Sequence, residues 1–230
     1  MREKDKMNNK VLRKNIDFIC TTKKGTNKTE NEDAYLIIQE PAFSFFIVFD
    51  GVGSAKNARK ATLLSKFFLK KNYKAYISEK VQLKELMFDL NNHLLDQSQE
   101  ELFTTYNLLF ISHNTDLIFF SSLGDSRLYK MNNQFLEQIS IDDSYSANVI
   151  TKCLGLKYYK ESVFESTILH KGAFSFLLCT DGFYNLMEKD KIYYFEIFCK
   201  KRLSNTKDLL RKRIAGNNND DATIIYIKNV

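Results

Sequence analysis

Proline and glycine are scarce in this sequence of 230 residues. The chain has one proline, Pro41, and eight glycines, most of which stand beside acidic segments. Nothing therefore resembles a flexible linker rich in proline, glycine or serine, and no internal repeat is visible. Because 44% of the residues are hydrophobic, the chain can bury one substantial core. We expect a single domain over residues 16–230 behind a basic tail over residues 1–15.

Long apolar runs are absent. No stretch approaches the roughly 18–20 apolar residues that a membrane-spanning helix needs. The first fifteen residues are charged and polar, unlike the apolar core of a signal peptide. The sequence therefore predicts a soluble, cytoplasmic protein without membrane association, and we expect it to be a monomer.

Cysteine and histidine, the usual zinc ligands, are few and scattered. No CxxC pair occurs, and no two of the three histidines have a metal-ligand spacing, so the sequence does not indicate a zinc site. The cysteines are expected to be reduced and mostly buried thiols. They are Cys20, Cys153, Cys179 and Cys199.

Positive charge exceeds negative charge by a small margin, with 34 Lys and Arg against 28 Asp and Glu. The lysines are spread over predicted helix faces and the first residues, without a stripe interleaved with aromatic side chains. The pattern therefore does not predict a nucleic-acid-binding protein. A cationic exterior around an acidic pocket would also help to attract phosphorylated substrates.

Acidic residues, in contrast, gather in five short segments spread along the chain. Three segments follow apolar runs that predict strands, at 47–49, 117–123 and 174–179. Each carboxylate should emerge where a buried strand reaches the surface, which brings together the hard oxygen ligands that divalent cations prefer. The segments are Asn31-Glu32-Asp33, Asp50-Gly51-Val52-Gly53, Gly124-Asp125-Ser126-Arg127, Thr180-Asp181-Gly182 and Asp220-Asp221-Ala222-Thr223.

The order of the predicted elements indicates an α+β fold. Apolar residues recur at helical spacing after Asp50, and one or more further helices are expected within 185–215. Runs of strands broken by paired helices, without regular βαβ alternation, favour layers over antiparallel sheets. Strands are predicted at about 16–22, 34–39, 43–50, 105–113, 116–123, 127–131, 135–139, 162–169, 174–180 and 222–228.

The motifs, taken in order, resemble a known family, the metal-dependent serine/threonine protein phosphatases of the PP2C (PPM) type in their compact bacterial form. The resemblance spans about residues 16–228. The matching segments are Gly25-x-x-Lys28-x-x-Asn31-Glu32-Asp33, Phe49-Asp50-Gly51-Val52-Gly53, Leu123-Gly124-Asp125-Ser126-Arg127, the stretch 148–155, Cys179-Thr180-Asp181-Gly182 and Asp220-Asp221-Ala222-Thr223.

This resemblance implies a sandwich of two antiparallel β-sheets flanked by paired α-helices, with a centre of two Mn²⁺ or Mg²⁺ ions at one edge. Asp50 would bridge the ions, the Gly51 carbonyl would bind one, and Asp181 and Asp220 would bind the other. A hydroxide held between two cations would attack phosphoserine or phosphothreonine directly, without a covalent phosphoenzyme.

The resemblance also implies roles for residues around the metal ligands. Glu32 and Asp33 would hold metal-bound waters, and Lys28 would contact the substrate phosphate. Asp125 and Asn185 match the positions that hold a third ion in bacterial members. The implied substrate is a phosphorylated protein, and the implied partner is a cognate bacterial serine/threonine kinase in a signalling pathway.

Three departures from the family pattern favour an alternative, a phosphatase-like binding or regulatory module with weak turnover. Lys28 stands where the family usually has arginine, and an ammonium grips phosphate less well than a bidentate guanidinium. Asn185 offers a neutral oxygen where relatives carry a carboxylate, which lowers the expected affinity for a third ion. The flap near residues 140–150 is shortened.

Overall fold

The structure, a computed structural model, describes residues 16–53, 55–78, 80–97, 101–146 and 149–230. The predicted tail over residues 1–15 lies outside the described residues. Among those described, no helix is long and apolar enough to cross a membrane.

Two five-stranded antiparallel sheets make up most of the strand content. Sheet 1 has the order β1-β12-β11-β6-β7, and sheet 2 has the order β10-β5-β4-β3-β2. Two further strands, β8 (Ser144–Ser146) and β9 (Val149–Ile150), pair with each other. The strands of sheet 1 are β1 (Phe18–Lys23), β6 (Arg127–Met131), β7 (Leu136–Gln138), β11 (Ser175–Cys179) and β12 (Ala222–Ile227). Those of sheet 2 are β2 (Ala34–Glu40), β3 (Phe43–Gly51), β4 (Thr104–Ser112), β5 (Leu117–Leu123) and β10 (Thr167–His170).

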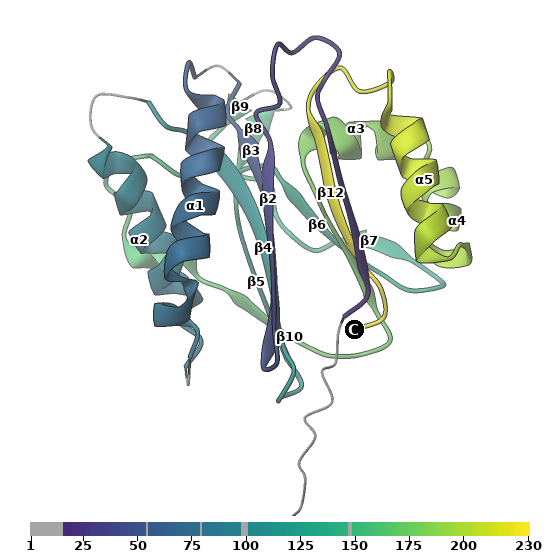
Figure 1. Cartoon of the computed structure of the whole chain (residues 1–230), viewed down its shortest axis with the longest axis horizontal. Helices are drawn as coiled ribbons and strands as arrows, with labels where there is room; N and C mark the ends of the chain where they lie inside the picture. The colour runs from purple at the N-terminus through teal and green to yellow at the C-terminus, as the bar shows by residue number, and fades with distance from the viewer. Residues whose placement is uncertain (1–15, 54, 79, 98–100, 147–148) are drawn as a thin grey trace, which may run out of the picture.

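The helices lie on the two outer faces of the sandwich, so that the molecule has four layers (Figure 1). Two helices pack on sheet 2 and three pack on sheet 1. The predicted α+β sandwich is therefore confirmed. The helices are α1 (Ala58–Tyr76), α2 (Leu83–Asp96), α3 (Asp181–Lys189), α4 (Lys191–Lys200) and α5 (Leu203–Ile214).

Alternation along the strands divides the apolar side chains among three cores. In β3, Phe45, Ile47 and Phe49 face α1 and α2, whereas Phe46 and Val48 face sheet 1. Successive side chains of a strand point to opposite faces, so a strand buried on both sides reads as one continuous apolar run. Both faces of β3 are covered, and the strand can deliver Asp50 only at its end.

The predicted strand over 162–169 is partly wrong. Its first half is a 3-10 helix, η1 (Glu161–Phe164), and β10 begins only at Thr167. Phe164 is fully buried against the core between sheet 2 and its helices, and Val163 packs there as well. The backbone turns so that both neighbouring side chains reach the same core, which an extended strand cannot do.

Helix α3 begins at Asp181, four residues before the helical region predicted over 185–215. Thr180 has an extended backbone, and its carbonyl accepts hydrogen bonds from the amides of Phe183 and Tyr184. The strand β11 therefore passes into the helix without an intervening turn. Asp181 stands in the first helical turn, where the helix dipole favours a negative charge.

Candidate active site

Five aspartates predicted from the sequence come together at one end of the sandwich. Asp50 lies at the end of β3 and Asp181 directly after β11, while Asp220 stands shortly before β12. Electrostatic repulsion from the other four members acts on Asp50. We call this group the acidic cluster; its members are Asp33, Asp50, Asp125, Asp181 and Asp220.

The end of β3 is held in a fixed position beside α1. The Thr104 hydroxyl donates a 2.8 Å hydrogen bond to the carbonyl of Asp50. A Cβ added at Gly51 would lie 2.9 Å from the backbone of Ala58, the first residue of α1. Glycine therefore allows the helix to start directly against the strand end, and its close approach positions the Asp50 side chain.

The loop before β12 crosses the start of α3 at equally close range. A Cβ added at Gly182 would lie only 2.2 Å from the carbonyl oxygen of Asp221. Thr180, one residue before Asp181, accepts a 2.9 Å bond from the amide of Thr223 at its hydroxyl. These contacts bring Asp181 and Asp220 to the same place although they are 39 positions apart in the sequence.

Two buried carboxylates of the acidic cluster each have an oxygen without a partner. The Thr180 hydroxyl donates to Oδ2 of Asp33 at 2.8 Å, but Oδ1 of Asp33 and Oδ1 of Asp125 have no hydrogen-bond partner among the described residues. Buried polar atoms are seldom left unsatisfied. The free oxygens therefore fit water molecules or ions that the protein holds in its working state.

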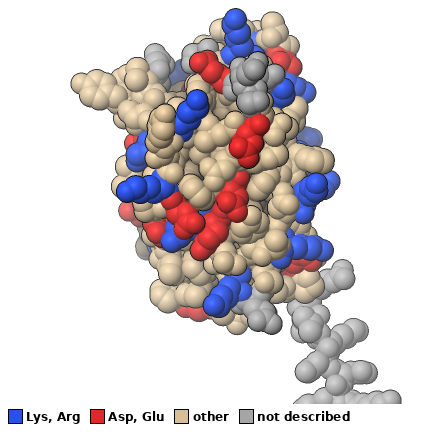
Figure 2. Space-filling view, turned by 90° about the vertical axis from the view of Figure 1, so that its left-hand side faces the viewer, with Lys and Arg blue, Asp and Glu red and all other residues tan. Residues whose placement is uncertain are grey.

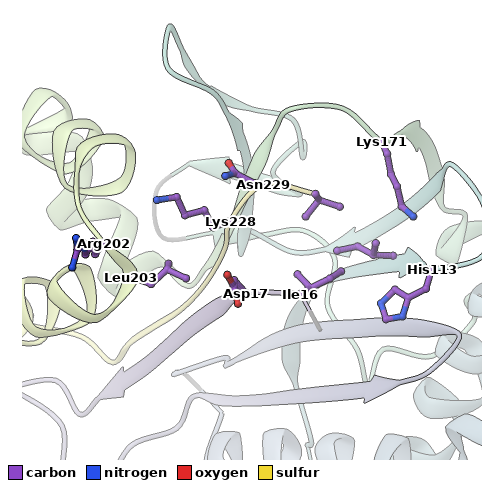
Figure 3. A pocket seen from close by; sticks show the side chains of 10 residues that line it. Ile16, Asp17, His113, Lys171, Arg202, Leu203, Lys228 and Asn229 are labelled. Atoms are coloured by element: carbon purple, nitrogen blue, oxygen red, sulfur yellow. The ribbon is translucent and has the colours of Figure 1, made fainter. Parts of the chain in front are cut away.

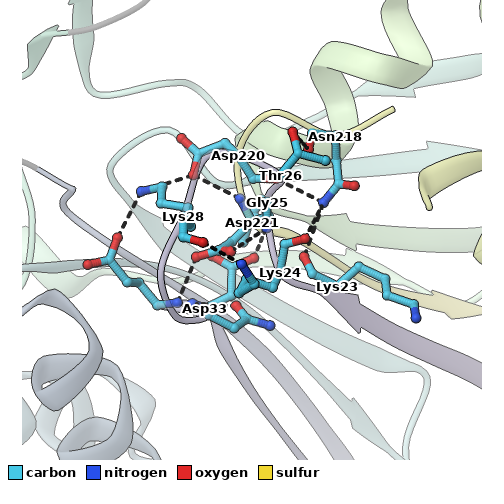
Figure 4. Close-up of polar contacts among 12 residues, drawn as sticks. Lys23, Lys24, Gly25, Thr26, Lys28, Asp33, Asn218, Asp220 and Asp221 are labelled. Carbon is cyan, nitrogen blue, oxygen red and sulfur yellow. Dashed lines mark hydrogen bonds and ion pairs between the residues drawn. The ribbon is translucent and has the colours of Figure 1, made fainter. Parts of the chain in front are cut away.

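Asp221, to which the sequence assigned no role, organises the loop between β1 and β2. Its Oδ1 accepts a hydrogen bond from the Gly25 amide, and its Oδ2 accepts one from the Glu32 amide, both at 2.7 Å (Figure 4). Asp221 is only 2% exposed. Both oxygens of the Asp221 carboxylate bind backbone amides of this loop. Asp221 therefore supports the site through the loop and does not face the acidic cluster.

Lys28 lies between two of the predicted site residues. Its Nζ is 2.8 Å from Oε2 of Glu32 and 3.0 Å from Oδ1 of Asp220 (Figure 4). Burial would lower the pKa of Lys28, but the hydrogen bonds with Glu32 and Asp220 outweigh burial and raise it. The Lys28 ammonium therefore stays protonated at neutral pH, at the edge of the acidic cluster.

Burial and mutual repulsion raise the pKa of four aspartates of the acidic cluster, Asp33, Asp50, Asp125 and Asp181. Burial, then the charge of Asp181, raises the pKa of Asp125 to about 6. Burial also raises the pKa of Asp33 and of Asp50 well above the ordinary range, and neighbouring aspartates add to the effect. The pKa of Asp181 rises for the same two reasons. Bound cations would relieve this repulsion, because they favour the charged carboxylates.

The raised pKa of Asp125 predicts how stability depends on pH when metal is removed by a chelator. The folded protein holds the carboxyl proton of Asp125 more tightly than the unfolded chain does. The stability that protonated Asp125 contributes is therefore fully present below pH 3.8 and is lost as the pH rises through about 6. We expect the thermal midpoint of the wild type, measured relative to Asp125→Asn, to fall over this window. A difference that stays flat or rises would contradict the assignment. Mn²⁺ added at neutral pH should restore the wild type.

The donor set fits a hard divalent cation. Carboxylate oxygens and a strand-end carbonyl are the ligands that Mg²⁺ and Mn²⁺ prefer. Among the residues that the structure describes, no three Asp, Glu, His or Cys side chains already stand in position to hold one ion together. The unpartnered oxygens and the mutual repulsion within the acidic cluster nevertheless indicate a place for positive charge.

Asn185 lies on α3, one helical turn after Asp181, and its side chain is exposed. Asp181 and Asn185 belong to one continuous helix, and the role of Asn185 at a third-ion position stays a prediction. Residues four apart share a helix face, so Asn185 and Asp181 project from the same side of α3. Asn185 is also too far inside the helix to cap its start.

The segment expected to be a shortened flap is anchored beside Asp125. Its Asp143 amide donates to the Gly124 carbonyl at 2.8 Å. Arg127 holds Asp142 at 2.8 Å and Glu188 of α3 at 2.7 Å, and its guanidinium lies 3.7 Å from the Tyr184 ring centre. The segment contains the strands β8 and β9, and residues 147–148 between them lie outside the described residues.

A separate cavity of about 510 Å³ lies at the other end of the sandwich (Figure 3). His113, Lys171, Arg202 and Lys228 are among its lining residues. Lys228 follows the last residue of β12, whereas Asp220 precedes the first. None of the predicted site residues lines this cavity, so we place the candidate active site at the acidic cluster.

Comparison with known proteins agrees with this fold. A sequence profile described as Protein phosphatase 2C matches residues 22–215. Because the match covers most of the chain, the chain belongs to the protein phosphatase 2C family, a family of serine/threonine phosphatases. The family and the enzyme class expected from the sequence are confirmed. No match was found among curated protein sequences.

Solved structures of low sequence identity share the fold. The chain is similar to a bacterial serine phosphatase, with a TM-score of 0.80 and 22% identity over 94% of this chain and 98% of that one. Stp1 from Staphylococcus aureus gives a TM-score of 0.78 and 22% identity over 94% and 95%. PstP/Ppp from Mycobacterium tuberculosis gives 0.73 and 16% identity over 93% and 98%.

Proposed function

We propose that this protein hydrolyses phosphoserine and phosphothreonine in a phosphorylated protein, using two Mn²⁺ or Mg²⁺ ions. Asp50, the carbonyl of Gly51, Asp181 and Asp220 would hold the ions. When bound, the ions activate water and neutralise charge on the phosphoryl oxygens. The observation that carries this proposal is the acidic cluster, whose buried carboxylates repel one another and leave two oxygens without partners.

The remaining site residues would position water and substrate. Asp33 is fixed by Thr180 and keeps Oδ1 free to orient a water. Asp125 offers a second free oxygen, and Glu32 lies at the rim beside Lys28. These side chains accept hydrogen bonds from water and so direct its lone pairs at the phosphorus.

Lys28 would contact the phosphate of the substrate. Its present partners, Glu32 and Asp220, hold it within reach of the acidic cluster. To serve as a ligand, Asp220 must turn away from this lysine, which then becomes available to a phosphate oxygen. The exchange keeps the ammonium paired with an anion throughout, so no isolated buried charge is created.

The direct test is hydrolysis of p-nitrophenyl phosphate and of a phosphothreonine peptide with Mn²⁺, Mg²⁺ or a chelator. We expect turnover with either ion and none after chelation, because carboxylate sites that keep several waters bind these ions only moderately. A phosphodiester substrate serves as the control for nuclease activity.

A protein that binds the metal but hydrolyses neither phosphomonoester would instead be a binding or regulatory module. We propose that it acts as a cytoplasmic monomer opposite a serine/threonine kinase.

Asn185→Asp should lower the Mn²⁺ concentration needed for half-maximal activity. The added carboxylate would stand one helical turn from Asp181 and would supply a negative charge to a third ion there, which the amide of Asn185 does not. Asn185→Ala should leave the metal requirement unchanged and stabilise the exposed helix position slightly, by about 0.5 kcal/mol. Metal titrations and thermal melts of both variants measure these effects. An unchanged Mn²⁺ response in Asn185→Asp would remove the third-ion proposal.

A further inference from the structure

A groove on the outer face of α1 carries apolar side chains that the core does not use. Leu63 is 46% exposed and Phe67 is 65% exposed, and they stand one turn apart on the helix. The groove has a volume of about 670 Å³. Five basic residues line it beside these two: Lys56, Arg59, Lys60, Lys66 and Lys70.

The charges around the groove favour an anionic partner. Among the described residues that line it, Glu30 is the acidic one, and it already pairs with Arg59 at 3.2 Å. Figure 2 shows the side of the molecule where α1 and α2 lie, with Lys and Arg side chains both left of the centre and along the right-hand edge, and acidic ones mostly nearer the centre. A ligand with negative charges would therefore meet an excess of positive charge in the groove.

The groove is next to the loop between β1 and β2, which carries Glu30 in the groove and Lys28, Glu32 and Asp33 at the candidate active site. Arg59 Nη1 donates a 2.7 Å hydrogen bond to the carbonyl of Asn31, the residue before Glu32. Phe67 lies about 14 Å along the helix axis from Ala58 at 1.5 Å per residue. A segment of about five extended residues spans that distance. A peptide whose phosphorylated residue is in the site can thus reach the groove.

We propose that this groove binds an acidic segment of the substrate protein that flanks the phosphorylated residue. The segment would carry apolar residues at alternate positions, because side chains two apart on an extended chain are about 7 Å apart and Leu63 and Phe67 are about 6 Å apart along α1. A concave groove suits such a chain better than a flat membrane surface. The proposal rests on the proposed function, since it names part of the substrate.

The test uses a fluorescein-labelled, unphosphorylated peptide in which glutamate and leucine alternate. Its binding is followed by fluorescence anisotropy, which needs neither metal nor turnover. We expect Phe67→Ser to weaken binding at least about tenfold, since the bound segment would cover the phenylalanine ring that is now 65% exposed. Ile192→Ser is the matched control, because Ile192 is 78% exposed on α4, and it should change nothing. Thermal melts of both variants should match the wild type.

A charge reversal gives a second test. Lys70→Glu should weaken binding of the same peptide and make that binding less dependent on salt, whereas Lys212→Glu on α5 should do neither. A peptide in which lysine replaces glutamate should not bind the wild type. Equal binding of the acidic and basic peptides would overturn the proposal, as would unchanged binding in Phe67→Ser.

Turnover then separates this proposal from the proposed function. With the phosphothreonine peptide extended by the acidic and apolar segment, Phe67→Ser should raise KM about tenfold and leave kcat unchanged. Hydrolysis of p-nitrophenyl phosphate should stay the same. If neither the wild type nor the variant hydrolyses p-nitrophenyl phosphate, the proposed function fails. The anisotropy measurement still shows whether the groove binds the acidic peptide. Phe67→Ser could instead leave peptide binding unchanged and abolish binding to phosphatidylserine vesicles or a dimer in solution. Either result would assign the groove to another occupant and contradict the proposal.

Discussion

Asp50→Asn is expected to lower kcat for the phosphothreonine peptide at least about a hundredfold, which corresponds to about 2.7 kcal/mol of transition-state stabilisation. Asp50 ends β3 at the centre of the acidic cluster, where the charges of Asp33, Asp181, Asp125 and Asp220 converge on it. An amide removes the anionic oxygen that would bridge the two ions. Steady-state kinetics at saturating Mn²⁺ measures the change, and Asp208→Asn on the exposed face of α5 is the control.

The same variant has a second, independent signature. Because the pKa of Asp50 is raised by burial and by its neighbours, an uncharged amide removes repulsion from the metal-free protein. The thermal midpoint of Asp50→Asn in chelator should therefore equal or exceed that of the wild type, while Mn²⁺ should stabilise only the wild type. Retention of more than about a tenth of wild-type kcat, a loss below about 1.4 kcal/mol, would exclude Asp50 as a metal ligand.

Gly182→Ala should disturb the place where the loop before β12 crosses the start of α3. The new Cβ would lie 2.2 Å from the Asp221 carbonyl, and this backbone cannot yield as the end of a flexible side chain can. Overpacking of this kind costs about 1–3 kcal/mol. The displaced loop would carry Asp220 away from Asp181. We expect a lower thermal midpoint together with a loss of activity that added Mn²⁺ does not fully restore.

Gly216→Ala is the matched control for this effect. Gly216 has a φ of +78°, but a Cβ there would meet nothing within 4 Å. The substitution should therefore cost about 1–2 kcal/mol of backbone strain and leave kcat and the metal requirement unchanged. If Gly182→Ala behaved like Gly216→Ala, with some lost stability and full activity, the close approach of the loop before β12 to the start of α3 would not position the metal ligands.

The strand ends that bear Asp50 and Asp181 could be predicted because local pattern determines them. A continuous apolar run ending in Asp-Gly reads as a buried strand that reaches the surface, and β3 and β11 follow that pattern. The limits of such local patterns appear at Val163 and Phe164. Two adjacent apolar residues fit a short strand as well as one turn of a 3-10 helix, and only packing against the helices decides between them.

The supporting residues of the site could not be predicted from the sequence. Thr180 reaches Asp33 across 147 positions, and Asp221 reaches Gly25 across 196. Such hydrogen bonds depend on how the strands of both sheets are arranged in space, which no local spacing reveals. The pairing of Lys28 with Asp220 is of the same kind. The sequence identified the charged groups but not the contacts that hold them.

Anomalous X-ray diffraction from crystals grown with Mn²⁺ tests the central claim most directly. The two-ion proposal predicts two manganese peaks beside Asp50. One should lie within about 2.0–2.2 Å of an oxygen of Asp181 and of an oxygen of Asp220, as for other small divalent cations. The other should lie at a similar distance from the Gly51 carbonyl oxygen. Peaks at another place, or no manganese at the acidic cluster in protein that hydrolyses the phosphothreonine peptide, would contradict it.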